Sequence, residues 1–179
     1  TGISAGLTTD AYRNTSGGIN AGDSFTSGSA TDNTLIGYDA GTAITTGDYN
    51  TAVGSYALQA TTTGERNTAS GFEALYTNTT GNYNTASGYT ALKSNTTANY
   101  NTAIGRNALL DNTTGSENTA VGSSSLSTNT TGGFNTAIGK DALVFNTTGS
   151  YNVASGYAAL YSNTTGDYNT ATGRAALYS

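Results

Sequence analysis

Asp48 and Glu65 are the residues of this sequence best placed to support catalysis. They lie 17 residues apart, and the next two residues at the same interval are Asn82 and Asn99. If the chain stacks with that period, the two carboxyl groups are held at about the 5 Å separation of a retaining glycosidase pair. Both acids, however, stand beside a glycine-containing turn, and Arg66 follows Glu65 directly. We therefore interpret them as solvated turn charges.

Other catalytic and metal-binding arrangements lack their essential residue types. The sequence contains no His and no Cys, so neither a Ser-His-Asp nor a Cys-His nucleophile can be built, and a structural zinc site lacks its ligands. The aspartate column of a calcium-binding nonapeptide repeat is also missing. We expect a protein that is not an enzyme and needs no metal or cofactor.

Charge and composition narrow the class of protein further. Only 9% of the residues are charged and the net charge is −5, with single, scattered basic residues where a nucleic-acid-binding protein needs clusters. No apolar run reaches the length of a membrane span, and no signal peptide is recognisable. The 13 Tyr, 4 Phe and abundant Thr favour ordered β structure over disorder.

A 17-residue repeat organises the chain. The unit reads N-T-A-x-G-x-x-A-L-x-x-N-T-T-G-x-Y, and we number its positions 1 to 17 from the first Asn. Position 1 falls at Asn33, Asn50, Asn67, Asn84, Asn101, Asn118, Asn135, Asn152 and Asn169. We expect residues 1–13 to be a cap or the end of a preceding segment, residues 14–32 a divergent first coil, and residues 33–179 tandem repeats with an incomplete last one.

The repeat predicts an all-β fold, a parallel β-solenoid or β-roll of stacked 17-residue coils. Each unit holds two short extended stretches separated by glycine and by the N-T-T-G turn, which leaves no room for helical repeats. One coil per repeat, stacked at the strand spacing of about 4.8 Å, places equivalent residues in columns along a rod.

Two columns are expected to fill the interior, namely Ala at position 3 and Leu at position 9. Leu35 is the exception at position 3, and the Gly at position 5 marks a bend that a Cβ would obstruct. The expected core comprises Ala52, Leu58, Ala69, Leu75, Ala86, Leu92, Ala103, Leu109, Ala120, Leu126, Ala137, Leu143, Ala154, Leu160, Ala171 and Leu177.

Position 4 lies on the opposite face of the same stretch, because side chains alternate along a strand. It is uncharged in every copy, whereas a solvated face would be expected to carry charge somewhere. We expect this face to pack against sister chains in a homotrimer, through its apolar members Ile36, Val53, Ile104, Val121 and Ile138.

Position 17 is mostly aromatic, with interruptions at Arg66 and Glu117. A stacked aromatic column stabilises adjacent coils, and an exposed one can also contact sugar rings. Both interpretations stay open for Tyr49, Tyr83, Tyr100, Phe134, Tyr151 and Tyr168. A second, shorter column holds Phe72, Tyr89 and Tyr157.

Asparagine and threonine columns carry further alternatives. Asn at position 1 favours a hydrogen-bonded ladder from coil to coil. The N-T-T turns match the glycosylation acceptor pattern, which is either turn chemistry or a row of sugars. Thr at position 2 could form an ice-binding ladder, but position 4 mixes Ile, Val, Ser and Thr. The candidate glycosylation sites are Asn78, Asn95, Asn112, Asn129, Asn146 and Asn163.

The string N-T-A-I/V-G-x-x-A-L with N-T-T-G turns resembles the collar and shaft repeats of bacteriophage tail fibres. Residues 33–58 look especially like fibres of marine phages, and the resemblance covers residues 14–179. The repeat is more distantly similar to the head repeats of trimeric autotransporter adhesins.

This resemblance implies a structural shaft or spacer on a virion or outside a cell, assembled as a homotrimer, that presents an adhesive tip to host-surface carbohydrate. The alternatives are a self-assembling bacterial surface filament or adhesin and, more remotely, an ice-binding solenoid.

Overall fold

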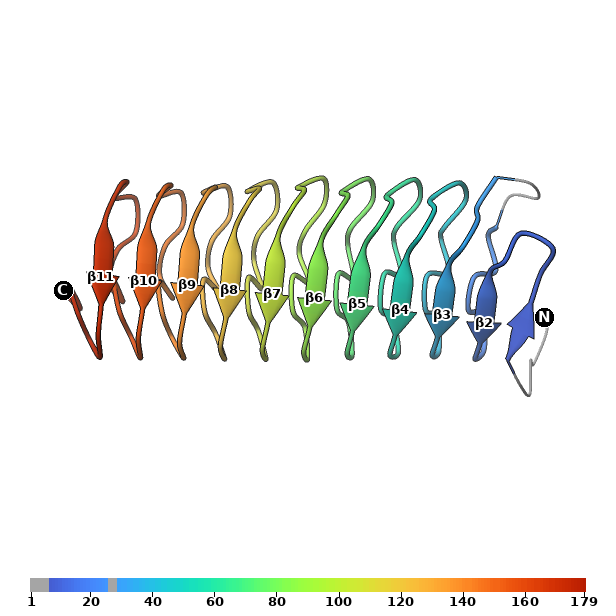
Figure 1. Cartoon of the computed structure of the whole chain (residues 1–179), viewed down its shortest axis with the longest axis horizontal. Coiled ribbons are helices and arrows are strands. Elements are labelled where there is room, and N and C mark those ends of the chain that lie inside the picture. The colour runs from blue at the N-terminus through green and yellow to red at the C-terminus, as the bar shows by residue number, and fades with distance from the viewer. Residues whose placement is uncertain (1–6, 26–28) are drawn as a thin grey trace.

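The protein is a straight rod of stacked coils, the architecture expected from the repeat (Figure 1). The computed structural model describes residues 7–25 and 29–179. Ten strands of three residues each lie side by side along one face of the rod. They are β2 (Thr15–Gly17), β3 (Thr34–Ile36), β4 (Thr51–Val53), β5 (Thr68–Ser70), β6 (Thr85–Ser87), β7 (Thr102–Ile104), β8 (Thr119–Val121), β9 (Thr136–Ile138), β10 (Val153–Ser155) and β11 (Thr170–Thr172).

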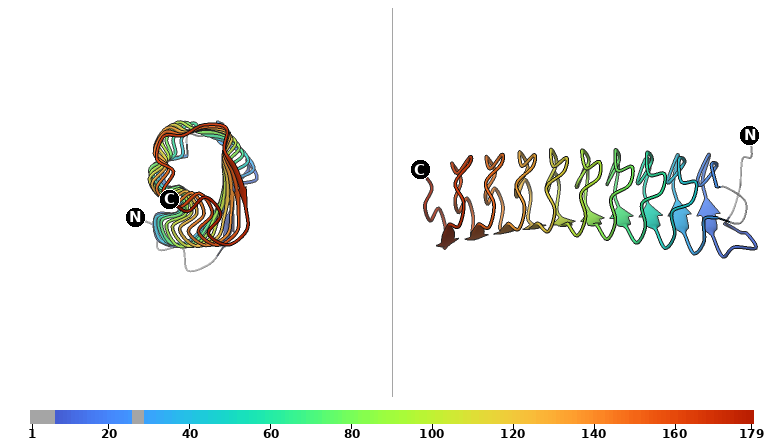
Figure 2. Two further views of the ribbon diagram at one scale, coloured as in Figure 1. Left: turned by 90° about the vertical axis from the view of Figure 1, so that its left-hand side faces the viewer. Right: turned by 90° about the horizontal axis from the view of Figure 1, so that it is seen from above.

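Strands β2 to β11 are all parallel and pair in register, which confirms the predicted solenoid. Ala52 of β4, for example, pairs with Ala69 of β5, so that the sequence period becomes a column in space. Seen along the rod axis, the coils nearly superpose, with a gradual rotation from one end to the other (Figure 2). Among the described residues, no helix reaches the length and hydropathy that a membrane-spanning helix requires.

The N-terminal end departs from this pattern. Strand β1 (Thr8–Thr9) pairs antiparallel with β2, where every other pair is parallel. Of the segment 1–13 that we expected to be a cap, residues 1–6 lie outside the described residues, as do residues 26–28 of the divergent first coil.

Each coil closes through turns with positive φ angles. Backbone bonds Ala57 N–H to Gly54 O (3.3 Å) and Gln59 N–H to Tyr56 O (3.4 Å) define two overlapping turns after β4. Their third residues, Tyr56 and Leu58, have φ of 63° and 54°, a requirement that type II turns usually meet with glycine. A left-handed non-glycine residue costs about 1–2 kcal/mol, and burial of a leucine side chain can offset that cost with about 1.5–3 kcal/mol.

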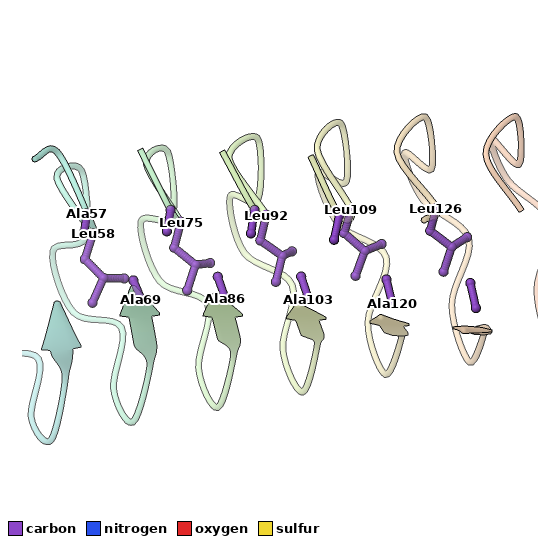
Figure 3. Close-up of a cluster of buried hydrophobic side chains, with 14 of the residues drawn as sticks. Ala57, Leu58, Ala69, Leu75, Ala86, Leu92, Ala103, Leu109, Ala120 and Leu126 are labelled. Atoms are coloured by element: carbon purple, nitrogen blue, oxygen red, sulfur yellow. The ribbon is translucent and has the colours of Figure 1, made fainter. Parts of the chain in front are cut away.

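The interior is filled by the alanine and leucine columns. The position 3 alanines from Ala52 to Ala154 and the position 9 leucines from Leu58 to Leu143 are buried, nearly all with no exposed surface. Figure 3 shows these leucines pointing across the coil toward the alanines. Leu177, in the final incomplete coil, is 58% exposed.

The second coil fills the same space with a different pair of residues. Leu35 replaces the position 3 alanine, and Gly41 replaces the position 9 leucine. A Cβ on Gly41 would lie 2.8 Å from both Cδ atoms of Leu35. The larger side chain at position 3 therefore takes the space that the position 9 leucine fills in the other coils.

The position 8 alanines and two asparagine columns complete the interior. At position 1, Asn101 accepts a hydrogen bond from the Asn118 backbone N–H (2.9 Å) and donates through Nδ2 to Gly115 O (2.9 Å). At position 12, Asn112 donates to Asn95 Oδ1 (3.1 Å) and to the same Gly115 carbonyl (2.9 Å). Among the described residues, no buried side-chain nitrogen or oxygen lacks a partner. The polar interior is thus fully hydrogen-bonded.

Candidate functional site

The two carboxylates that most resembled a catalytic pair have structural roles. Asp48 Oδ1 accepts the backbone N–H of Thr31 (2.7 Å), one coil earlier. Position 16 repeats this bond along the rod, as when Asn99 Oδ1 accepts the Asn82 N–H (2.7 Å). Glu65 instead pairs with Arg66, 2.8 Å from its guanidinium. Asp48 therefore stabilises a turn, whereas the Glu65 carboxylate takes part in an exposed ion pair.

Several other charged groups form ion pairs on the surface of the rod. Lys93 lies 2.7 Å from Glu73, and this hydrogen bond raises the pKa of the lysine. The hydrogen bond from Arg13 lowers the pKa of the Asp32 carboxyl group. Across the described residues, no three His, Cys, Asp or Glu side chains come together as a metal site would require.

The asparagines of the N-T-T turns are buried, which favours turn chemistry over the glycosylation alternative. Their side chains form the position 12 ladder in the interior, and a buried amide that donates two hydrogen bonds cannot carry a sugar in the folded chain. Asn78, Asn95, Asn112, Asn129 and Asn146 have no exposed surface, and Asn163, in the last complete coil, makes the same pair of bonds.

The outward face of the strands presents the columns at positions 2 and 4. Position 2 is a row of half-exposed to exposed threonines, broken by Val153. The position 4 residues Ile36, Val53, Ile104 and Ile138 are 39–46% exposed, and Val121 is half-buried. An uncharged stripe with unpartnered aliphatic groups thus runs along this side of the rod, where we expected sister chains to pack.

The position 17 aromatics stack on one another along the rod. Tyr83 and Tyr100 have ring centroids 4.9 Å apart with an interplanar angle of 10°, and Phe134, Tyr151 and Tyr168 form a second stack with centroid spacings of 4.8 and 4.9 Å. A sugar ring binds an aromatic side chain through the ring face. Neighbouring rings cover those faces within each stack, so the geometry favours the stacking interpretation over glycan contact.

A second aromatic cluster lies on the coils that precede Tyr83. The Tyr56 ring meets Tyr38 and Phe72 edge-to-face, with centroids at 5.3 and 5.8 Å, and contacts Tyr76 at 6.3 Å. Burial among these rings raises the pKa of the Tyr56 hydroxyl. We missed this cluster in the sequence because it joins residues of positions 6, 7 and 10 from three different coils, and not one column.

A shallow depression lies at the face of the last coil. Leu160, Asn163, Thr165, Asn169 and Leu177 line it, and none of them ionises.

Comparison with known proteins adds no assignment, because no family model, curated protein or solved structure matches this chain.

Proposed function

We propose that this chain is a structural shaft segment of an extended fibre, of the bacteriophage tail-fibre type, which spaces an adhesive tip away from a virion or cell surface. In this proposal the shaft assembles as a homotrimer through the outward face of its strands. A self-assembling bacterial surface filament or adhesin is the alternative that the same rod would serve.

The uninterrupted, in-register stack is the observation that carries the proposal. Every strand from β2 to β11 pairs with its neighbour in the same register, and polar and apolar columns continue from coil to coil. The charged groups are few, and several are engaged in turns and surface ion pairs, which suits a spacer better than a catalyst.

A spacer should tolerate changes in length, and this gives a direct test. Deletion of residues 118–151 removes two whole coils and joins Glu117 to Asn152, which preserves the repeat. We expect the shortened chain to keep its fold and oligomeric state, while the rod seen by small-angle X-ray scattering shortens by about 10 Å. A matched deletion of residues 118–142, which is not a whole number of coils, should misfold.

Two results would contradict the proposal. One is a wild-type chain that scatters as a compact sphere instead of a rod. The other is a whole-coil deletion that unfolds the chain as completely as the mismatched one, because the coils would then not be interchangeable spacers.

Ice binding is the second candidate, favoured by the threonine row on the outward face of the strands. The neighbouring position 4 row mixes aliphatic and hydroxyl side chains irregularly, so the regular double row of an ice-binding face is absent. Thermal hysteresis in dilute solution would support this candidate, and its absence at millimolar concentration would remove it.

A further inference from the structure

Arg66 shows what a cation does in the position 17 column. Its guanidinium carbon lies 5.2 Å from the Tyr49 ring centroid and 5.4 Å from that of Tyr83. Arg66 thus takes the place of an aromatic residue in the stack. It lies between the rings of Tyr49 and Tyr83, which are two coils apart. Cations are attracted to aromatic faces at these distances.

Glu117 occupies the equivalent place in a second gap of the column, with the opposite charge. Tyr100 and Phe134 lie one coil to either side of it, so their rings are about 9.6 Å apart. Both rings are exposed, at 58% and 46%. Among the described residues, no hydrogen-bond or ion-pair partner reaches the Glu117 carboxylate. The gap therefore has two ring faces and a carboxylate but no cation.

Arg106 is an exposed cation without a partner in its own chain. Its guanidinium makes no ion pair and covers no ring among the described residues. It stands at position 6, two residues after β7, whereas Glu117 stands at position 17, two residues before β8. The two residues thus flank opposite ends of the outward strand face.

We propose that the gap at Glu117 is a binding site for a guanidinium group, filled by Arg106 of a second copy of this chain that lies parallel to the first. The inference rests on the proposed side-by-side assembly and specifies its contact and register. In parallel, unstaggered copies Arg106 stands between the levels of Tyr100 and Glu117, because it follows the first by 6 residues and precedes the second by 11 in a 17-residue coil.

The rest of the two columns is complementary in the same register. Bulky residues of position 6 in one copy face rings or the arginine of position 17 in the next copy. These facing sets are Phe72 with Arg66 and Tyr83, Tyr89 with Tyr83 and Tyr100, Lys140 with Phe134 and Tyr151, and Tyr157 with Tyr151 and Tyr168. In these sets rings meet rings or cations and Glu117 meets an arginine, whereas Tyr38 would face Asp32 as well as Tyr49.

Cross-linking tests this contact directly, because the wild-type chain has no cysteine. Single variants R106C and E117C, mixed in equal amounts and treated with a short bis-maleimide, should give a product of about twice 18.0 kDa. The matched control replaces E117C by T114C, an exposed turn residue of the same coil. We expect at least tenfold less product from the control mixture.

Charge reversal supplies the second readout. R106E or E117R alone should raise the dissociation constant of the assembly about tenfold, and R106E/E117R should restore it. Circular dichroism verifies that each variant folds, which is expected because both side chains are exposed.

The outcomes separate the two levels of the proposal. If the wild-type chain assembles but the 106–117 mixture cross-links no better than the control, the Glu117 contact is wrong and the shaft assembly stands. If the wild-type chain is a folded monomer at all concentrations, the assembly itself is wrong.

Discussion

The asparagine ladder predicts that the buried hydrogen bond from Asn101 Nδ2 to Gly115 O stabilises the fold. Asn101→Asp replaces the Nδ2 donor by oxygen while it keeps the size of the side chain. In the wild-type chain that donor bonds Gly115 O at 2.9 Å, and Oδ1 accepts the Asn118 N–H at 2.9 Å. Asn101 has no exposed surface, so the new carboxyl group is removed from water.

The expected loss follows from the desolvation of this carboxylate. Burial raises the pKa of a carboxyl group, by 3–5 units when it is complete, and each unit corresponds to about 1.4 kcal/mol. The Asn118 N–H offsets part of this by bonding the charged form, which leaves about 3–5 kcal/mol of destabilisation at pH 7. The protonated form can still donate to Gly115 O and accept from Asn118, so it resembles the amide.

The stability of the N101D variant therefore falls as pH rises. The folded-state pKa of the introduced carboxyl group is raised above its unfolded value, so stability is greatest below the unfolded pKa of about 4 and is lost as pH rises through the folded pKa. Urea unfolding of N101D between pH 3 and 8 should show a midpoint that falls with pH relative to wild type.

A nearby asparagine supplies the control. N99D changes the same residue type at position 16, where Asp48 and Asp167 already accept the equivalent backbone bond. Its midpoint should stay close to wild type at every pH. An N101D midpoint that matches N99D at pH 7 would refute the ladder reasoning.

Three further predictions concern the bend, the core and the aromatic column. Gly105→Ala should lower the thermal unfolding midpoint strongly, because φ is 132° and the new Cβ would lie 2.6 Å from Gly122 O; an unchanged midpoint would contradict the close approach. G41L should be destabilised by a clash with Leu35, and L35A should lose about 2–5 kcal/mol of stability by leaving a cavity. The double variant L35A/G41L should recover part of this loss. Losses in urea unfolding that simply add would refute the idea that the two side chains share one space. Arg66→Ser should cost about 1–2 kcal/mol by removing two ring contacts, and Arg66→Tyr should restore it by completing the stack; equal stability of the two variants would count against stacking.

The fold was predictable because the repeat is nearly perfect. A constant interval of 17 residues leaves one simple solution, in which equivalent residues form columns. Position 3 alanine and position 9 leucine are the most regular apolar positions, and the structure buries both. The glycine at position 5 was predicted to mark a bend, and φ at Gly105 is indeed 132°.

The role of the N-T-T asparagines was not predictable from the local pattern. Asn-Thr-Thr-Gly is typical of an exposed turn, and such turns are candidate modification sites. Asn112 instead turns inward, because its amide completes the hydrogen bonding of the Gly115 carbonyl that Asn101 also uses. Only the path of the backbone brings these three residues together.

The left-handed backbone conformation of the position 9 leucines was also not predictable from the sequence. Leu109 has a φ of 51°, in a region that sequence rules reserve for glycine and asparagine. The stacking of adjacent coils imposes this conformation through the Leu109 N–H bond to Ser125 O (3.0 Å), one coil further on. Tertiary hydrogen bonding thus overrides local preference.

The molar mass of the folded chain in solution tests the central claim most directly. Multi-angle light scattering at several concentrations, combined with small-angle X-ray scattering, should give a rod whose mass is three times 18.0 kDa. A folded 18.0 kDa monomer that persists at high concentration would contradict the account, because the uncharged strand face would then have no sister chain to cover it.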